Sequence, residues 1–94
     1  MADFIFLMHD DAPAGLDWDP YLSRLREHGC FQGGSAIGNG ACERKAGEPP
    51  APTAHITGFI RVTADDMAQA RTLLTGNPVY EAGGTVEIRE LPSG

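Results

Sequence analysis

His9, His28 and His55 are the three histidines of the chain, and they are its best candidates for acid–base chemistry. His55 stands after a proline-rich stretch, where a central strand is expected to begin. An imidazole titrates near neutral pH, so His55 can act there as a general base. It can equally be a hydrogen-bonded residue that ties down the neighbouring loop. We take His55 as the candidate catalytic residue and keep the structural role as the alternative.

A second candidate group, His9-Asp10-Asp11, ends the first apolar run of the chain. Neighbouring side chains of a strand point to opposite faces, so His9 and Asp10 cannot enter one pocket. His9 and Asp11 can share a pocket if the strand continues. We therefore take His9 and Asp11 as candidate ligand-binding residues. The alternative is a solvated acidic turn.

Arg61 and Arg89 alternate with apolar residues in two expected strands, which directs both side chains away from the helices. A guanidinium in that position can clamp a carboxylate or a phenolate of a ligand. It can also form an interchain ion pair with a glutamate. The hydroxyl of Tyr21 can donate to a ligand, or its ring can belong to the core. We count Arg61, Arg89 and Tyr21 among the candidate ligand-binding residues.

The cysteine and glycine patterns predict no cofactor. Cys30 and Cys42 stand apart, without a CxxC pair or a nearby pair of histidines, which favours two reduced thiols over a metal site. Gly33-Gly34 and the pair Gly38 and Gly40 do not form a phosphate-binding GxGxxG loop. We therefore expect no metal ion and no redox cofactor.

Length and composition favour one globular domain over residues 1–94, with 41% hydrophobic residues and a formal net charge of −6. The acidic balance, without a basic cluster, opposes nucleic-acid binding because phosphates are repelled. The longest apolar run, Phe4 to Met8, is too short to span a bilayer. The first residues also lack the basic segment of a secretory signal. We expect a cytoplasmic protein without membrane or nucleic-acid partners.

The first half of the chain reads as a strand, a helix and an irregular strand. Phe4 to Met8 is apolar on both alternating faces, as in a strand covered on both sides. Residues 17–28 have helical spacing, with Asp19 as the expected N-cap, Pro20 behind it and Gly29 at the end. The strand that begins at Cys30 is interrupted by glycines, so we expect a bulge or a bend, followed by a proline-rich loop over 46–54.

The second half predicts strand, helix and strand. His55 to Thr63 is the clearest central strand, Asp65-Asp66 resembles the start of a capped helix, and Thr85 to Leu91 is the last strand. This order predicts an α+β ferredoxin-like βαββαβ fold, with a four-stranded antiparallel sheet and both helices on one face. The other face is then bare and apolar. We expect it to pair with a second copy in a homodimer.

Runs of residues along nearly the whole chain match one known family in the same order. The matching runs are Phe4 to Asp11, Trp18, Tyr21-Leu22, Leu25 to Gly29, Gly33-Gly34, Pro50, His55 to Phe59, Asp65 to Ala70, Asn77-Pro78 and Gly83 to Arg89. The sequence resembles the YCII-related family, in its branch with DGPF-type motifs, within the dimeric α/β-barrel superfamily. The resemblance implies ferredoxin-like subunits whose sheets pack face to face, with a cavity in each subunit.

The resemblance also bears on function. His55 matches a histidine of the branch's His-Ile-Gly-Gly-aromatic stretch. The Asp-Gly-Pro-Phe motif itself is absent, and the first helix offers Tyr21-Leu22 or Trp18-Asp19 where typical members carry His-Leu. We expect a small organic molecule, such as an oxygenated aromatic or a lactone, to bind in the cavity, with acid–base chemistry at His55. The alternative is a non-catalytic dimeric accessory or regulatory module that binds a metabolite or a protein partner.

Overall fold

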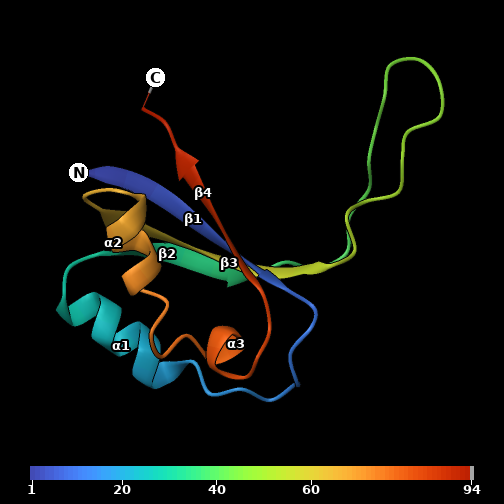
Figure 1. Cartoon of the computed structure of the whole chain (residues 1–94). Helices are drawn as coiled ribbons and strands as arrows, with labels where there is room; N and C mark the ends of the chain where they lie inside the picture. Colours follow the sequence, from blue (N-terminus) through green and yellow to red (C-terminus); the bar gives the residue numbers. More distant parts are fainter. Residues whose placement is uncertain (94) are drawn as a thin grey trace.

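The computed structural model describes residues 1–93, which form one antiparallel sheet and three helices. The elements are β1 (Ala2–His9), α1 (Asp19–Glu27), β2 (Phe31–Ala36), β3 (Ile56–Ala64), α2 (Met67–Thr72), α3 (Pro78–Glu81) and β4 (Val86–Leu91). The strands lie in the order β2-β3-β1-β4, and all helices lie on one side of them (Figure 1). The predicted ferredoxin-like α+β fold is confirmed.

The two faces of β1 lie in different surroundings. Phe4, Phe6 and Met8 are buried between the sheet and the helices, and Phe6 opposes Ile60 of β3 and Ile88 of β4. The alternate residues of β1 are only half-buried and lie on the face without helices. We call that face of the sheet the open face. Within one chain, therefore, only one of the two apolar faces of β1 is fully covered.

The N-cap of α1 lies one residue earlier than the sequence predicted, and the helix itself is shorter than the expected range 17–28. Trp18, not Asp19, is the N-cap, and its helical backbone (φ −87°, ψ −18°) gives no side-chain cap. The carboxylate of Asp17 instead accepts the Asp19 N–H at 3.1 Å. Pro20 lies in the first turn, and Gly29, with φ +71°, ends the helix as predicted. Tyr21 and Leu25 form the buried side of α1.

Side-chain caps define the short helices α2 and α3. The Asp66 carboxylate accepts the Gln69 N–H at 2.8 Å, as in a capping box, while the Gln69 side chain accepts the N–H of Asp65, one residue before the N-cap. Asn77 caps α3 by accepting the Tyr80 N–H at 3.1 Å. The region around Tyr80 is therefore a single helical turn, which the sequence had not predicted.

The strand β2 is irregular, as its glycines predicted, because its pairing with β3 shifts register between Phe31 and Gly34. A Cβ at Gly34 would lie 2.5 Å from the carbonyl oxygen of Phe59, so only glycine fits there. Residues 37–55 then leave the sheet as a long excursion, visible on the right of Figure 1, which we call the arm. Over residues 1–93, no helix has the length and apolar character needed to cross a membrane.

Candidate functional site

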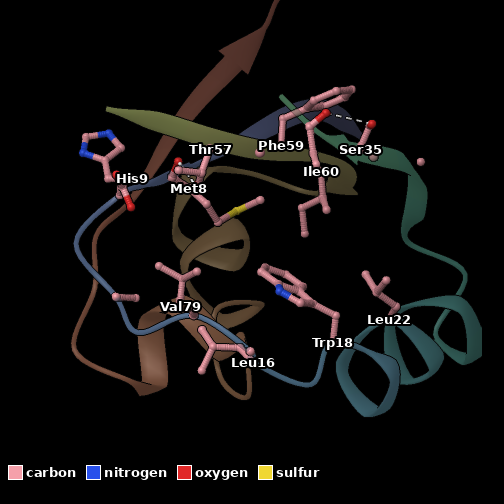
Figure 2. Close-up of a pocket in the computed structure, with 18 of the residues that line it drawn as sticks. Met8, His9, Leu16, Trp18, Leu22, Ser35, Thr57, Phe59, Ile60 and Val79 are labelled. Carbon is pink, nitrogen blue, oxygen red and sulfur yellow. Dashed lines mark hydrogen bonds between the residues drawn. The ribbon is translucent and has the colours of Figure 1, made fainter. Parts of the chain in front are cut away.

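A cavity of about 670 Å³ lies between the sheet and the segment that leads into α1. Figure 2 shows Met8 and Ile60 of the sheet, Trp18 and Leu22 of the α1 region, and Val79 of α3 gathered around it. The lining is predominantly apolar. Its size and character match those of pockets that bind small organic molecules.

Glycines on the sheet side make room for this cavity. Gly58 of β3 and Gly34 of β2 both line it, and Gly34 lies opposite Ile60, another lining residue. A Cβ at Gly58 would lie 3.2 Å from the carbonyl oxygen of Ser35 and 3.8 Å from Cε of Met8. Because these two glycines have no side chains, the part of the cavity between Met8 and Ile60 stays unfilled.

Trp18 is the single tryptophan of the chain, and it contributes an aromatic wall to the cavity. Its ring meets the Tyr21 ring edge to face, with centroids 6.0 Å apart and planes inclined by 66°. Such a pair is favourable because the positive edge of one ring meets the negative face of the other. The carbonyl of Trp18 accepts the Leu22 N–H at 3.0 Å, which ties this residue to the start of α1. Packing and backbone bonding together orient the indole.

Few charged groups lie along the cavity wall. Arg26 is the one arginine among the lining residues that the structure describes, and no lysine joins it. Its guanidinium carbon lies 5.0 Å from the centroid of the Phe31 ring, a cation–π contact. Asp10, Ser35 and Thr57 add polar groups to the lining. The cavity can therefore receive an apolar ring and offers one permanent cation to an anionic substituent.

The candidate His9 belongs to the lining, yet its ring lies on the other side of the sheet. His9 follows Met8 in β1, and Figure 2 shows its ring directed away from Trp18 and Ile60. Its Nε2 lies 3.1 Å from Oε1 of Glu87, whose Oε2 accepts from Nη1 of Arg89 at 3.2 Å. The His9 and Arg89 partners hold the pKa of Glu87 below its ordinary value.

The candidate His55 is exposed and lies just before β3. Its ring contacts the His9 ring with centroids 4.9 Å apart, and its carbonyl accepts the Asp10 N–H at 2.7 Å. His55 is not among the residues that line the cavity. We call His9, His55, Glu87 and Arg89 the histidine cluster. The structure thus joins three of the sequence candidates, but outside the cavity.

The other three candidates lie apart from the cavity. Asp11 accepts the hydroxyl and the N–H of Thr85, at 2.6 and 2.7 Å, and these two bonds lower its pKa. Tyr21 is 3% exposed, its hydroxyl donates to the Leu73 carbonyl at 2.7 Å, and burial raises its pKa to about 12. Arg61 is exposed on the open face, opposite Ile5. Asp11 therefore joins the β1–α1 segment to β4 rather than pairing with His9.

The family resemblance predicted a cavity, but the sequence did not identify the residues that line it. Trp18, Leu22 and Arg26 were noted only within runs that match the family, without a role in the cavity. The available signal was weak: Gly34 and Gly58 lie in neighbouring strands, but Gly34 pairs with Ile60 and Gly58 with Ala36. In the portion of the chain that the structure describes, no group of three or more histidine, cysteine or acidic residues is arranged to hold a metal ion.

The comparison with solved structures gives one informative match. The chain is similar to a 5-chloro-2-hydroxyhydroquinone dehydrochlorinase from Burkholderia phenoliruptrix, solved in complex with 2,5-dihydroxybenzoquinone. The TM-score is 0.60 at 16% identity, over 98% of this chain and 95% of that chain. No family model and no curated protein matches the sequence. At this identity the similarity establishes the shared fold.

Proposed function

We propose that this protein is a cytoplasmic homodimer of the YCII-related family that binds a small, flat, oxygenated aromatic molecule in the cavity beside Trp18. The observation that carries the proposal is the cavity of about 670 Å³ with its apolar lining and aromatic wall. The structurally similar dehydrochlorinase, in complex with 2,5-dihydroxybenzoquinone, supports this ligand class.

The chemistry of the lining favours a ring with acidic oxygen substituents. A flat ring can stack on Trp18 and contact Met8 and Ile60, which removes apolar surface from water. A phenolate or an enolate oxygen at the rim gains a charge-assisted hydrogen bond from Arg26. Asp10 lies in the same lining and disfavours a dianion close to it.

The homodimer is proposed from the open face of the sheet. In β1, Ile5 lies between Arg61 and Arg89, and Leu7 lies between Phe59 and Glu87. These apolar side chains are half-buried in the single chain, and a second sheet packed on them removes the remaining surface from water. Light scattering at low micromolar concentration is expected to give about twice the chain mass of 10.0 kDa. A monomer at that concentration contradicts the dimer.

Fluorescence of the single tryptophan tests the binding proposal directly. We expect 2,5-dihydroxybenzoquinone to quench Trp18 saturably, after correction with free tryptophan amide for light absorbed by the quinone. Ala36→Phe places a ring at a lining position and is expected to abolish saturable quenching. Ala68→Phe, at an exposed position of α2, is the matched control and keeps it. Saturable quenching that survives Ala36→Phe contradicts binding in this cavity.

Acid–base chemistry at the histidine cluster is the second candidate function. It is favoured by the contact between Glu87 and His9, which fixes one imidazole beside His55. If it occurs, 5-chloro-2-hydroxyhydroquinone added without oxygen loses hydrogen chloride, its absorbance spectrum changes as hydroxybenzoquinone forms, and His55→Ala stops the change without weakening Trp18 quenching by the quinone. A bound quinol whose spectrum stays constant with the wild-type protein favours the non-catalytic accessory module instead.

A further inference from the structure

The arm, residues 37–55, extends from the sheet without packing on its own domain. Its side chains are exposed, apart from the half-buried Cys42 and Pro49. Within 38–54 the structure gives one hydrogen bond, from Nη1 of Arg44 to the Glu48 carbonyl at 3.1 Å, which closes the tip. The radius of gyration is 14.7 Å, where a compact domain of this length has about 12 Å. The arm accounts for this excess.

An excursion of this length calls for a physical reason. Loops beyond about 12–15 residues are uncommon in compact domains and are usually functional or disordered. Ordering the arm costs conformational entropy, and contacts with its own domain do not offset that cost. Pro49, Pro50 and Pro52 reduce the freedom of the returning limb, which lowers the cost of holding the arm extended. The missing contacts must then come from another molecule.

The two limbs of the arm are attached at the end of the sheet where β1 stops. The Ile37 N–H donates to the Thr57 carbonyl at 2.9 Å, and the His55 carbonyl accepts the Asp10 N–H at 2.7 Å. Figure 1 shows the arm rising from this end on the side away from the helices. It therefore extends on the side where a second sheet packed on the open face would lie.

Charge distinguishes the arm from the rest of the chain. Glu43 and Glu48 balance Arg44 and Lys45, so the arm carries no net charge and the remaining residues carry the whole −6. Two acidic domains repel each other, whereas a neutral arm can contact an acidic domain without that penalty. Lys45, the only lysine of the chain, stands at the tip with its ammonium exposed. The chemistry of the tip thus complements an acidic protein surface.

We propose that the arm clasps a second copy of this chain, with Lys45 at its tip against carboxylates of the partner's domain. The inference rests on the open-face dimer proposed above and adds a contact that the sheets alone do not make. Each subunit then donates one arm and receives one, because the two copies of a symmetric dimer make the same contacts.

Zero-length cross-linking tests this contact. A carbodiimide joins an amine to a neighbouring carboxylate, and Lys45 and the N-terminal amine are the only amines of the chain. We expect an equal mixture of light and ¹⁵N-labelled chains to give peptides in which Lys45 of one isotope is joined to an acidic residue of the other. Dimers in which Lys45 is joined only within its own chain, or not at all, overturn the proposal.

Two variants measure the energetic contribution of the tip. Lys45→Glu is expected to raise the dimer dissociation constant about threefold to tenfold at low salt and less at high salt. Lys45→Arg keeps the charge but removes the amine, so it abolishes the cross-link and leaves the dissociation constant unchanged. An unchanged constant in Lys45→Glu contradicts the contact. A protein that is monomeric by light scattering also overturns it, while Trp18 quenching still reports separately on the cavity.

Discussion

The two faces of the sheet present different chemistry, although the same strands build both. Facing the helices, Met8 and Ile60 lie in an apolar cavity beside Trp18. On the open face, the next residue, His9, contacts Glu87 and His55. One step along β1 therefore separates an apolar binding wall from a polar cluster, because successive side chains of a strand point to opposite faces. A ligand in the cavity meets surfaces suited to binding, with the imidazoles turned away from it.

The sharpest test of this contrast is a pair of alanine substitutions in β1. Phe6→Ala removes a fully buried ring on the helix side and is expected to lower the free energy of unfolding by about 3–5 kcal/mol. Leu7→Ala, on the open face, is the matched control and is expected to cost less, with a loss relative to the wild type that shrinks on dilution as both proteins become monomers. Urea unfolding followed by circular dichroism measures both. Equal losses at all concentrations would contradict the assignment of the two faces.

The next largest effect is expected from a substitution of Gly34, on the sheet side of the cavity. Gly34→Ala forces a methyl group to 2.5 Å from the Phe59 carbonyl oxygen, so β2 must shift, at an expected cost of about 1–3 kcal/mol. Trp18 quenching by the quinone is expected to weaken as well, since Gly34 lines the cavity. Gly38→Ala, with open space around the new methyl group, is the control and is expected to change neither the melting temperature nor the quenching.

A smaller effect is expected from the hydroxyl of Tyr21. Tyr21→Phe leaves the Leu73 carbonyl without its donor and is expected to cost about 1 kcal/mol of unfolding free energy while quinone binding persists. Glu87→Gln weakens the His9 and Arg89 contacts on the more exposed open face and is expected to cost less. Both values come from urea unfolding at neutral pH. If Glu87→Gln loses more unfolding free energy than Tyr21→Phe, the histidine cluster stabilises the fold more than its exposure predicts.

The smallest expected effect is the acid dependence of stability. The pKa values of Asp11 and Glu87 are lowered from their ordinary 3.8 and 4.5, so the unfolded chain takes up these protons first as the pH falls. Their contribution is therefore complete above the ordinary values and is lost as the pH falls through the lowered ones. Between about pH 6 and pH 3, Asp11→Asn is expected to lose less stability than the wild type, as measured by urea unfolding. If the wild type and Asp11→Asn lose the same unfolding free energy over this pH range, the contacts of Asp11 with Thr85 do not contribute to stability.

Local signals predicted most of the fold because each depends on residues close in sequence. The strand at β1, the capped start of α2 at Asp66 and the stop at Gly29 appear in the structure as expected. The helix start at Trp18 was missed because a proline in the first turn fits either neighbour as the cap. The single turn of α3 was missed because four residues carry too little periodicity to recognise.

The candidate site was predicted less well, because its partners are far apart in sequence. His9 and Asp11 were considered able to share one pocket, yet in the structure His9 contacts Glu87 and Asp11 accepts hydrogen bonds from Thr85. Both partners come from the far end of the chain, and sheet pairing between β1 and β4 brings them to His9 and Asp11. Spacing along the chain contains no such information.

The sequence by itself determined the order of the elements, the faces of the strands and the bulge in β2. Hydrophobic periodicity and glycine positions act through local backbone geometry, which a single sequence exposes. Only the tertiary structure decided that Met8, Trp18 and Ile60 enclose a cavity, and that His9 and His55 lie outside it. A cavity is the space left where separate elements meet, so its existence depends on how strands and helices pack and not on any one segment.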